Sequence, residues 1–242
     1  GRAGLAERQP WKALPKAVRS VAFSSDARFL AAAGDGGHVR VFDMVENRVL
    51  QVAETGRSAD VLKVAFCPST NYLAVAGDDG ILKVWDVDRW QKPLAEIEIG
   101  SPLLSAEFDK TGTRLVVSRR DGRVSLLAFD PTALTDPLQL LATSIEAHAD
   151  AAGSVKFSVD SQMIVSAGYT QDSSLRFWDV PGVQPIGGPL LVKRGGVSRI
   201  AISPSGKRVA MIDGLQIVIL ELGTREIVAR LKVPSSGFGG DI

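Results

Sequence analysis

Short apolar segments alternate with polar turn sequences along most of the chain. The apolar segments are rich in Val, Ile, Leu and Phe, and turn sequences such as DDG, TGT, RDG and SPSG separate them at intervals of about ten residues. Within 61–66, Leu62, Val64 and Phe66 alternate with their neighbours and therefore share one face of an extended segment. The segment 93–99 alternates apolar and polar residues, as an outer strand with one solvent-facing side does. The pattern predicts many short β-strands joined by tight turns.

The same pattern returns five times along the chain. Similar segments begin at Val18, Val61, Leu103, Gly153 and Val197, and the apolar residue that anchors each one is Phe23, Phe66, Phe108, Phe157 and Ile202. A repeat of about 40–45 residues is the length of a four-stranded propeller blade. We therefore predict an all-β fold of four-stranded antiparallel blades. The expected units are about 17–56, 57–99, 100–147, 148–193 and 194–233, with an N-terminal extension (1–16) and a C-terminal tail (234–242).

The third predicted strand of several units ends in an aromatic residue followed by aspartate. These pairs are Phe42-Asp43, Trp85-Asp86 and Trp178-Asp179, and the turns include Asp79-Gly80, Asp121-Gly122 and Asp213-Gly214. With these motifs the units resemble those of the WD-repeat β-propeller family over residues 17–233. Because propellers of this family commonly have seven blades, the resemblance implies that the five units are part of a larger, about seven-bladed propeller. Closure with strands of another chain and a five-bladed ring are the alternatives.

A histidine, a serine, an aspartate and a tryptophan recur together in blades of this family as one hydrogen-bonded chain. The resemblance gives His148, Ser166, Asp172 and Trp178 this structural role. A Ser-His-Asp nucleophile is the alternative, but the sequence around these residues has no recognisable nucleophile-bearing turn or oxyanion hole. In the second unit, Asp79 is expected to hold the turn and Trp85 to pack inside the blade.

The resemblance also implies partner contacts from two sets of loops, those leading into each first strand and those between the second and third strands. The residues at these positions are Arg19, Asp60, Leu62, Asp78, Arg119, Arg120, Tyr169 and Lys193. Arginine and tyrosine are enriched among the residues that dominate binding energy at protein interfaces. We therefore expect these eight residues to include the partner-binding site, although a solvated loop charge is the alternative for each arginine.

Composition removes several other classes of function. Lys and Arg total 28 and Asp and Glu total 27, so the charge balance gives no reason to expect nucleic acid as a partner. Cys67 is the single cysteine, which excludes an internal disulfide and fits a reducing, cytoplasmic location. No apolar run approaches the roughly 20 residues that span a bilayer. No metal-ligand spacing or phosphate-binding loop is present, so no cofactor is expected.

These observations favour a non-catalytic scaffold that binds proteins or peptides, as a subunit of a larger complex. The first alternative is a sensor or regulatory domain of a larger signalling or trafficking protein. The second is an enzymatic or small-molecule-binding propeller that uses its central channel. Against this last class, the starts of the inner strands supply Ser20, Lys63, Ser105, Ser154 and Ser198 without catalytic partners.

Overall fold

The computed structural model describes residues 14–54, 59–144, 147–169, 171–180, 182–192 and 197–232. These residues form five antiparallel sheets of four strands each, and in every sheet the strands are neighbours in the order in which they occur in the chain. Each sheet is therefore a meander, which we call a blade. The segment Asp35–Gly37 is a short 3-10 turn (η1). The all-β, four-stranded architecture predicted from the repeats is confirmed.

The strands of the five blades have the following bounds. Blade 1 contains β1 (Val18–Phe23), β2 (Phe29–Gly34), β3 (His38–Asp43) and β4 (Arg48–Glu54), and blade 2 contains β5 (Val61–Phe66), β6 (Tyr72–Gly77), β7 (Ile81–Asp86) and β8 (Ala95–Glu98). Blade 3 contains β9 (Leu103–Phe108), β10 (Arg114–Arg119), β11 (Val124–Phe129) and β12 (Leu138–Thr143). Blade 4 contains β13 (Ala152–Phe157), β14 (Met163–Gly168), β15 (Ser174–Asp179) and β16 (Leu190–Leu191), and blade 5 contains β17 (Val197–Ile202), β18 (Arg208–Asp213), β19 (Gln216–Glu221) and β20 (Ile227–Lys232).

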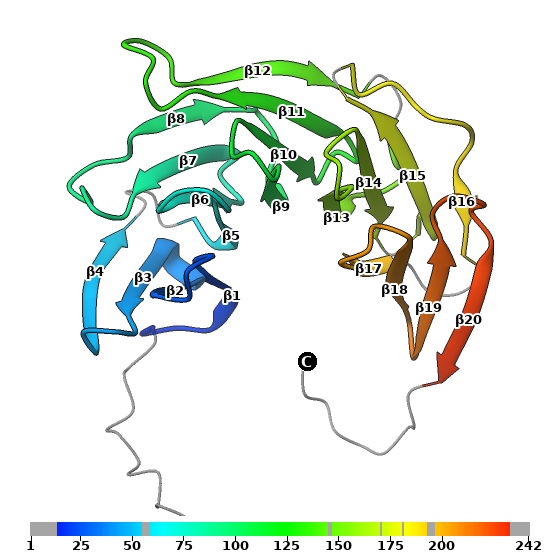
Figure 1. Cartoon of the computed structure of the whole chain (residues 1–242), viewed down its shortest axis with the longest axis horizontal. Coiled ribbons are helices and arrows are strands. Elements are labelled where there is room, and N and C mark those ends of the chain that lie inside the picture. Colours follow the sequence, from blue (N-terminus) through cyan, green and yellow to red (C-terminus); the bar gives the residue numbers. More distant parts are fainter. Residues whose placement is uncertain are drawn as a thin grey trace, which may run out of the picture.

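The five blades stand side by side around a common axis (Figure 1). The first strand of each blade, from β1 to β17, lies on the inside of the arrangement, and the fourth strands, from β4 to β20, lie on its outer rim. Blades 1 and 5 face each other across the opening of an arc. The five blades therefore do not close into a five-bladed ring, and that alternative does not describe the structure.

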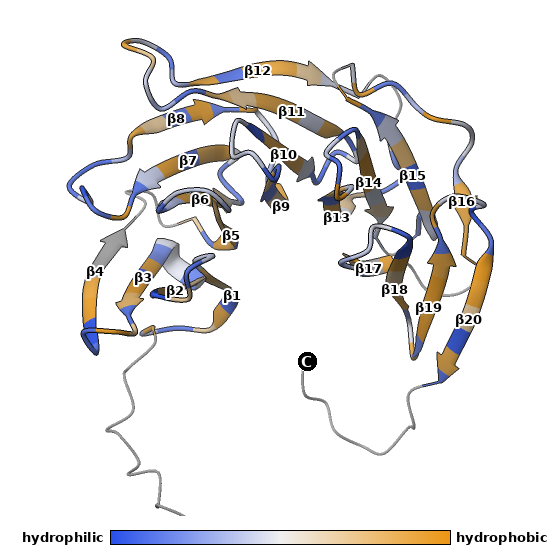
Figure 2. Cartoon of the chain, in the orientation of Figure 1, coloured by the Kyte–Doolittle hydropathy of each residue, from blue (hydrophilic) through white to orange (hydrophobic). Residues whose placement is uncertain are grey.

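The hydrophobic core lies in layers between successive blades. Phe29 and Val39 of blade 1 pack in one cluster with Val61, Val64 and Phe66 of blade 2, and similar clusters join the other blades. Hydrophobic residues are concentrated in the strands, whereas the connecting turns are largely polar (Figure 2). The first strands of blades 2 to 5 are therefore buried on the side that faces the preceding blade.

The two end blades expose the faces that the inner blades bury. Val21 and Phe23 of blade 1 are each 59% exposed, whereas the equivalent Val64 and Phe66 of blade 2 are 0% and 9% exposed. At the other end of the arc, Ile212 of blade 5 is 40% exposed. In blades 1, 2 and 4 the strand position equivalent to Ile212 is held by a fully buried alanine, namely Ala33, Ala76 and Ala167. The arc thus ends on two apolar sheet faces, each of which has the form of a blade-to-blade interface.

Candidate functional site

The predicted histidine network lies inside blade 4. His148 Nδ1 is 3.1 Å from Asp172 Oδ2, His148 Nε2 is 2.7 Å from Ser166 Oγ, and the Trp178 indole N–H donates to Ser166 Oγ at 2.8 Å. Asp172 also accepts hydrogen bonds from the Ser174 hydroxyl and from the backbone N–H of Ala149. The structure therefore brings all four predicted residues together in one connected chain of hydrogen bonds.

Burial decides the protonation of this network. Burial lowers the pKa of His148 to about 4, although the Asp172 carboxylate opposes the shift, so the imidazole is neutral at pH 7. Burial also raises the pKa of Asp172, but the hydrogen bonds from Ser174 and Ala149 outweigh this effect and lower the pKa overall. Ser166 is fully buried, and its hydroxyl is hydrogen-bonded to both His148 Nε2 and the Trp178 indole N–H. A substrate in solution cannot reach that hydroxyl, so the arrangement holds the blade together and does not present a nucleophile.

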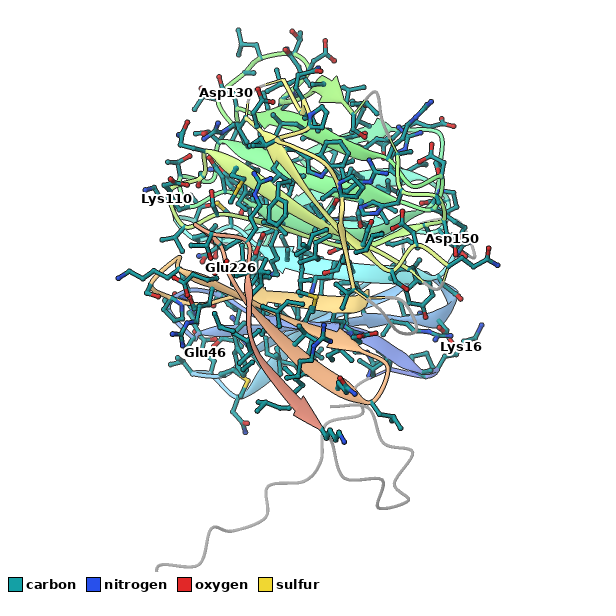
Figure 3. The ribbon with its side chains drawn as sticks, turned by 90° about the vertical axis from the view of Figure 1, so that its right-hand side faces the viewer. Lys16, Glu46, Lys110, Asp130, Asp150 and Glu226 are labelled. Atoms are coloured by element: carbon teal, nitrogen blue, oxygen red, sulfur yellow. The ribbon has the colours of Figure 1, made fainter. Side chains whose placement is uncertain are left out.

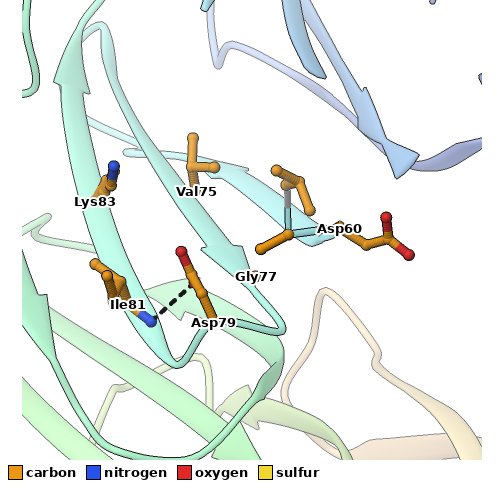
Figure 4. Close-up of a pocket in the computed structure, with 8 residues that line it drawn as sticks. Asp60, Val75, Gly77, Asp79, Ile81 and Lys83 are labelled. Atoms are coloured by element: carbon orange, nitrogen blue, oxygen red, sulfur yellow. Dashed lines mark hydrogen bonds between the residues drawn. The ribbon is translucent and has the colours of Figure 1, made fainter. Parts of the chain in front are cut away.

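The second blade shows how the acidic turns work. The Asp79 carboxylate accepts a hydrogen bond of 3.1 Å from the backbone N–H of Ile81 and so fixes the turn before β7 (Figure 4). The space beside this turn is a cavity of about 10 Å³, which has room for one water molecule but not for a larger ligand. Trp85 is buried and stacks on Trp90 with ring centroids 4.9 Å apart. Both predicted residues therefore lie within the frame of blade 2.

The two ends of the propeller carry different sets of loops. Lys16 and Asp150, which precede first strands, lie at one end, whereas Glu46, Lys110 and Asp130 lie at the opposite end (Figure 3). We call the first of these the entry end, because the chain enters each blade there. The expected partner-contact residues that the structure describes, which are all except Lys193, belong to loops and strand starts at the entry end.

A cavity of about 490 Å³ opens on the inner side of the blades near the entry end. All five first strands contribute to its wall, together with the loops that follow β10 and β14. The lining residues are Arg19, Leu62, Lys63, Leu104, Ser105, Arg120, Gly153, Ser154, Lys156, Tyr169, Arg199 and Ile200. Because the wall combines segments from every blade, the cavity exists only in the assembled arc.

The charges on this wall are all positive. Arg19 forms an ion pair of 2.6 Å with Asp35, and Lys156 forms one of 2.7 Å with Glu107. For Lys63, Arg120 and Arg199, no carboxylate of the described residues lies within ion-pair distance. Burial lowers the pKa of Lys63, and the nearby charges of Lys156 and Arg199 lower it further. The cavity therefore holds a local excess of positive charge.

The structure gathers only some of the expected contact residues at the cavity. Arg19, Leu62, Arg120 and Tyr169 line it, and Tyr169 is 45% exposed at its edge. The other four expected residues are placed differently. Asp60 accepts a hydrogen bond of 2.8 Å from the backbone N–H of Gly36, and the backbone N–H of Asp78 donates to the Asp60 carbonyl. The Arg119 side chain is 11% exposed and pairs with Asp121 at 2.5 Å. Lys193 lies outside the described residues.

Sequence reasoning missed Lys156 and Arg199 as members of this surface. Ser198 is the expected counterpart of Lys63 in blade 5, but the strand register corrects this alignment. Val197 pairs with Asp213 and Ile200 with Met211, as Val61 pairs with Gly77 and Val64 with Val75 in blade 2. Arg199 therefore occupies the position of Lys63. An alignment anchored on Ile200, instead of on the serines that recur in other blades, would find it.

Two further classes of site receive no support from the described part of the chain. No group of three or more His, Cys, Asp or Glu side chains among these residues is placed to hold a metal ion. No helix within the described ranges has the length and apolar character needed to cross a membrane.

Comparison with known proteins adds family information. Residues 10–43, 49–86 and 139–179 each match the family model described as "WD domain, G-beta repeat". No curated protein matches the sequence. Among solved structures, a chain of the "Crystal Structure of Mitotic Checkpoint Complex" is similar to this one with a TM-score of 0.76 and 18% sequence identity. The alignment covers 88% of this chain and 64% of that chain, so this chain spans less than two thirds of the length of the structure it matches.

Proposed function

The chain is a WD-repeat protein whose repeats form blades of a β-propeller, and from this premise we propose that it is a non-catalytic scaffold that binds other proteins. The observation that carries the proposal is the cavity near the entry end, to which every blade contributes a first strand. A surface of this kind is assembled from the repeats as a whole, so it suits recognition of a partner by several blades at once.

The residues on this surface differ from blade to blade while the frame repeats. The second position of the first strand is Arg19, Leu62, Leu104 and Gly153 in blades 1 to 4, whereas the fourth position is a buried apolar residue in blades 2 to 5. Buried positions are constrained by packing, and exposed ones are free to serve recognition. This division supports a binding surface specific for one class of partner.

The chemistry of the cavity supports binding and gives little support to catalysis. Its polar lining residues are cations, serines and one tyrosine, and neither histidine of the chain is among them. General acid–base chemistry near pH 7 relies on groups whose pKa lies close to that pH, most often histidine. His148 is engaged inside blade 4, so the proposed scaffold has no catalytic role for it.

The proposal extends to how the arc is completed. The exposed faces at Val21 and Phe23 and at Ile212 have the composition of blade-to-blade interfaces. Exposed apolar surfaces of this kind mark sites of contact. We infer that further blades cover both faces and that the scaffold works as a larger propeller within a complex. A cytoplasmic setting belongs to the same proposal, and the free, buried Cys67 is consistent with it.

Affinity purification coupled to mass spectrometry tests the proposal. The parent chain is compared with Tyr169→Ala and Arg120→Glu at the cavity, and with Lys110→Glu at the opposite end as the matched control. We expect a defined set of proteins to be lost from both cavity variants and kept by the control. Partners that bind all three variants as they bind the parent would show that the cavity is not the contact surface.

A further inference from the structure

We propose that the cavity near the entry end binds an acidic segment of a partner protein, one that places two or more carboxylates close together beside an apolar side chain. This inference rests on the proposed scaffold function and names the chemistry of its partner. The first observation is the composition of the wall. Five of the twelve lining residues are Lys or Arg and none is Asp or Glu, although the whole chain carries 28 basic and 27 acidic residues.

Two partly buried arginines outside the cavity show a different arrangement, because each is paired with a carboxylate of its own blade. Arg28 pairs with Asp43 at 3.0 Å, and Arg114 pairs with Asp109 at 3.0 Å, and both aspartates are fully buried. These pairs satisfy their charges within single blades. The cations of the cavity instead come from different blades and converge on a common space.

Three cations of the cavity, Lys63, Arg120 and Arg199, have no carboxylate within ion-pair distance in the part of the chain that the structure describes. The nearby Glu107 does not neutralise them, because one of its oxygens accepts from Lys156 Nζ and the other from the backbone N–H of Phe157, both at 2.7 Å. Placing like charges together in a concave site raises the local potential and attracts anions. Their mutual repulsion disfavours the empty site, and a bound carboxylate cluster would relieve it.

The shape and the remaining lining residues indicate a peptide. Leu62 and Leu104 are half-buried and form apolar wall between the charged positions, and Tyr169 is exposed at the edge. A tyrosine ring offers an amphipathic contact for a side chain or for peptide backbone. Guanidinium groups bind carboxylates in a planar, bidentate way. An extended acidic segment with a neighbouring apolar residue uses all of these groups together.

The test is fluorescence anisotropy with two labelled peptides, one with six glutamates followed by Leu-Phe and the other with six glutamines followed by Leu-Phe. We expect the glutamate peptide to bind and the glutamine peptide to bind at least tenfold more weakly. Serine stands at the Lys63 position in blades 1, 3 and 4, so Lys63→Ser and Arg199→Ser fit the frame of a blade. The double variant is expected to lose at least tenfold in affinity for the glutamate peptide. Lys110→Ser, at the opposite end, is the matched control and keeps full affinity.

Two further variants and a competitor make the test decisive. Lys63→Arg and Arg199→Lys keep the charge and are expected to keep binding, which separates loss of charge from loss of fold. Equal binding of the two peptides, or equal loss in the Lys110→Ser control, would overturn the inference. Preferential binding of single-stranded poly(U) at the same residues would also overturn it in favour of a nucleic-acid site. If Tyr169→Ala and Arg120→Glu lose protein partners while neither peptide binds, the scaffold proposal stands and only the acidic ligand is wrong.

Discussion

The contribution of the Trp178–Ser166 hydrogen bond to stability can be measured by making the same substitution at Trp178 and at Trp85. Each tryptophan stands in the third strand of its blade, where Trp178 pairs with Ile164 and Trp85 with Leu73 across the sheet. The Trp178 indole N–H donates to Ser166 Oγ, whereas the buried Trp85 indole N–H has no hydrogen-bond partner among the described residues. Replacing each by phenylalanine removes the same atoms, so the difference between the variants isolates the N–H group.

The magnitude follows from the two environments. Trp178→Phe removes a buried hydrogen bond, which costs about 0.5–1.5 kcal/mol net. Trp85→Phe removes a buried N–H that is already unpaired, which relieves a penalty of about 1–3 kcal/mol. Partial loss of the Trp85–Trp90 stacking, worth about 0.5–1.5 kcal/mol, offsets part of this gain. We expect Trp178→Phe to be the more destabilising by about 2 kcal/mol, or about 4–8 °C in Tm for a chain of this size.

Urea and thermal unfolding followed by circular dichroism at a β-sheet wavelength measure this difference without relying on tryptophan fluorescence. Ser166→Ala provides the cross-check, because it removes the same bond from the other side. Trp178→Phe and Ser166→Ala should then be less destabilising together than the sum of their separate effects. Equal losses of stability at Trp178 and Trp85, or a larger loss at Trp85, would refute the assignment of the hydrogen-bonded network to blade 4.

Three other predictions concern acid stability, the ends of the arc and the charge of the cavity. The pKa of His148 is about 4 in the folded state and 6.5 in the unfolded state, so the unfolded state binds more protons between these two pH values. The free energy of unfolding should therefore fall by about 3 kcal/mol as the pH drops from 6.5 to 4. Urea unfolding at a series of pH values should show this fall, and His148→Gln should show a flatter pH profile. Phe66→Ser should cost about 3–5 kcal/mol and the exposed Phe23→Ser less than about 1 kcal/mol in thermal melts, and similar costs would contradict the described end of the arc. Glu107→Gln removes the carboxylate that pairs with Lys156 and so adds one unpaired positive charge to the cavity. The anisotropy assay should then show tighter binding of the glutamate peptide, and weaker binding would argue against binding through the positive charge of the cavity.

The blades could be predicted from the sequence because their signals are local and are repeated. The turn before β7, with Asp79 and Gly80, and the anchors from Phe23 to Ile202 recur at a nearly constant spacing. A single Trp-Asp pair would have been weak evidence, but five copies of the pattern reinforce one another. The network of His148 with Ser166 was expected from the family resemblance, and its members lie within one blade.

The cavity could not be predicted in the same way, because its wall comes from strands far apart in the sequence. Arg119 and Arg120 are adjacent and were equivalent from the sequence alone, yet Arg119 is tied to Asp121 and only Arg120 reaches the cavity. The sequence pattern pointed to Ser198 instead of the neighbouring Arg199, and only the pairing of β17 with β18 shows that Arg199 occupies the position of Lys63. Side-chain direction and pairing in loops depend on tertiary contacts that local pattern does not encode.

Site-specific photo-crosslinking tests the central claim, which is that partner proteins bind at the cavity. A benzophenone amino acid is placed at Tyr169 on the edge of the cavity and, in a second sample, at the fully exposed Leu134 in the loop between β11 and β12. The account predicts that crosslinks to a partner protein form from position 169, disappear when Arg120→Glu is added, and do not form from position 134. Crosslinks to the same partner from position 134 alone, or crosslinks from position 169 that Arg120→Glu leaves unchanged, would contradict it.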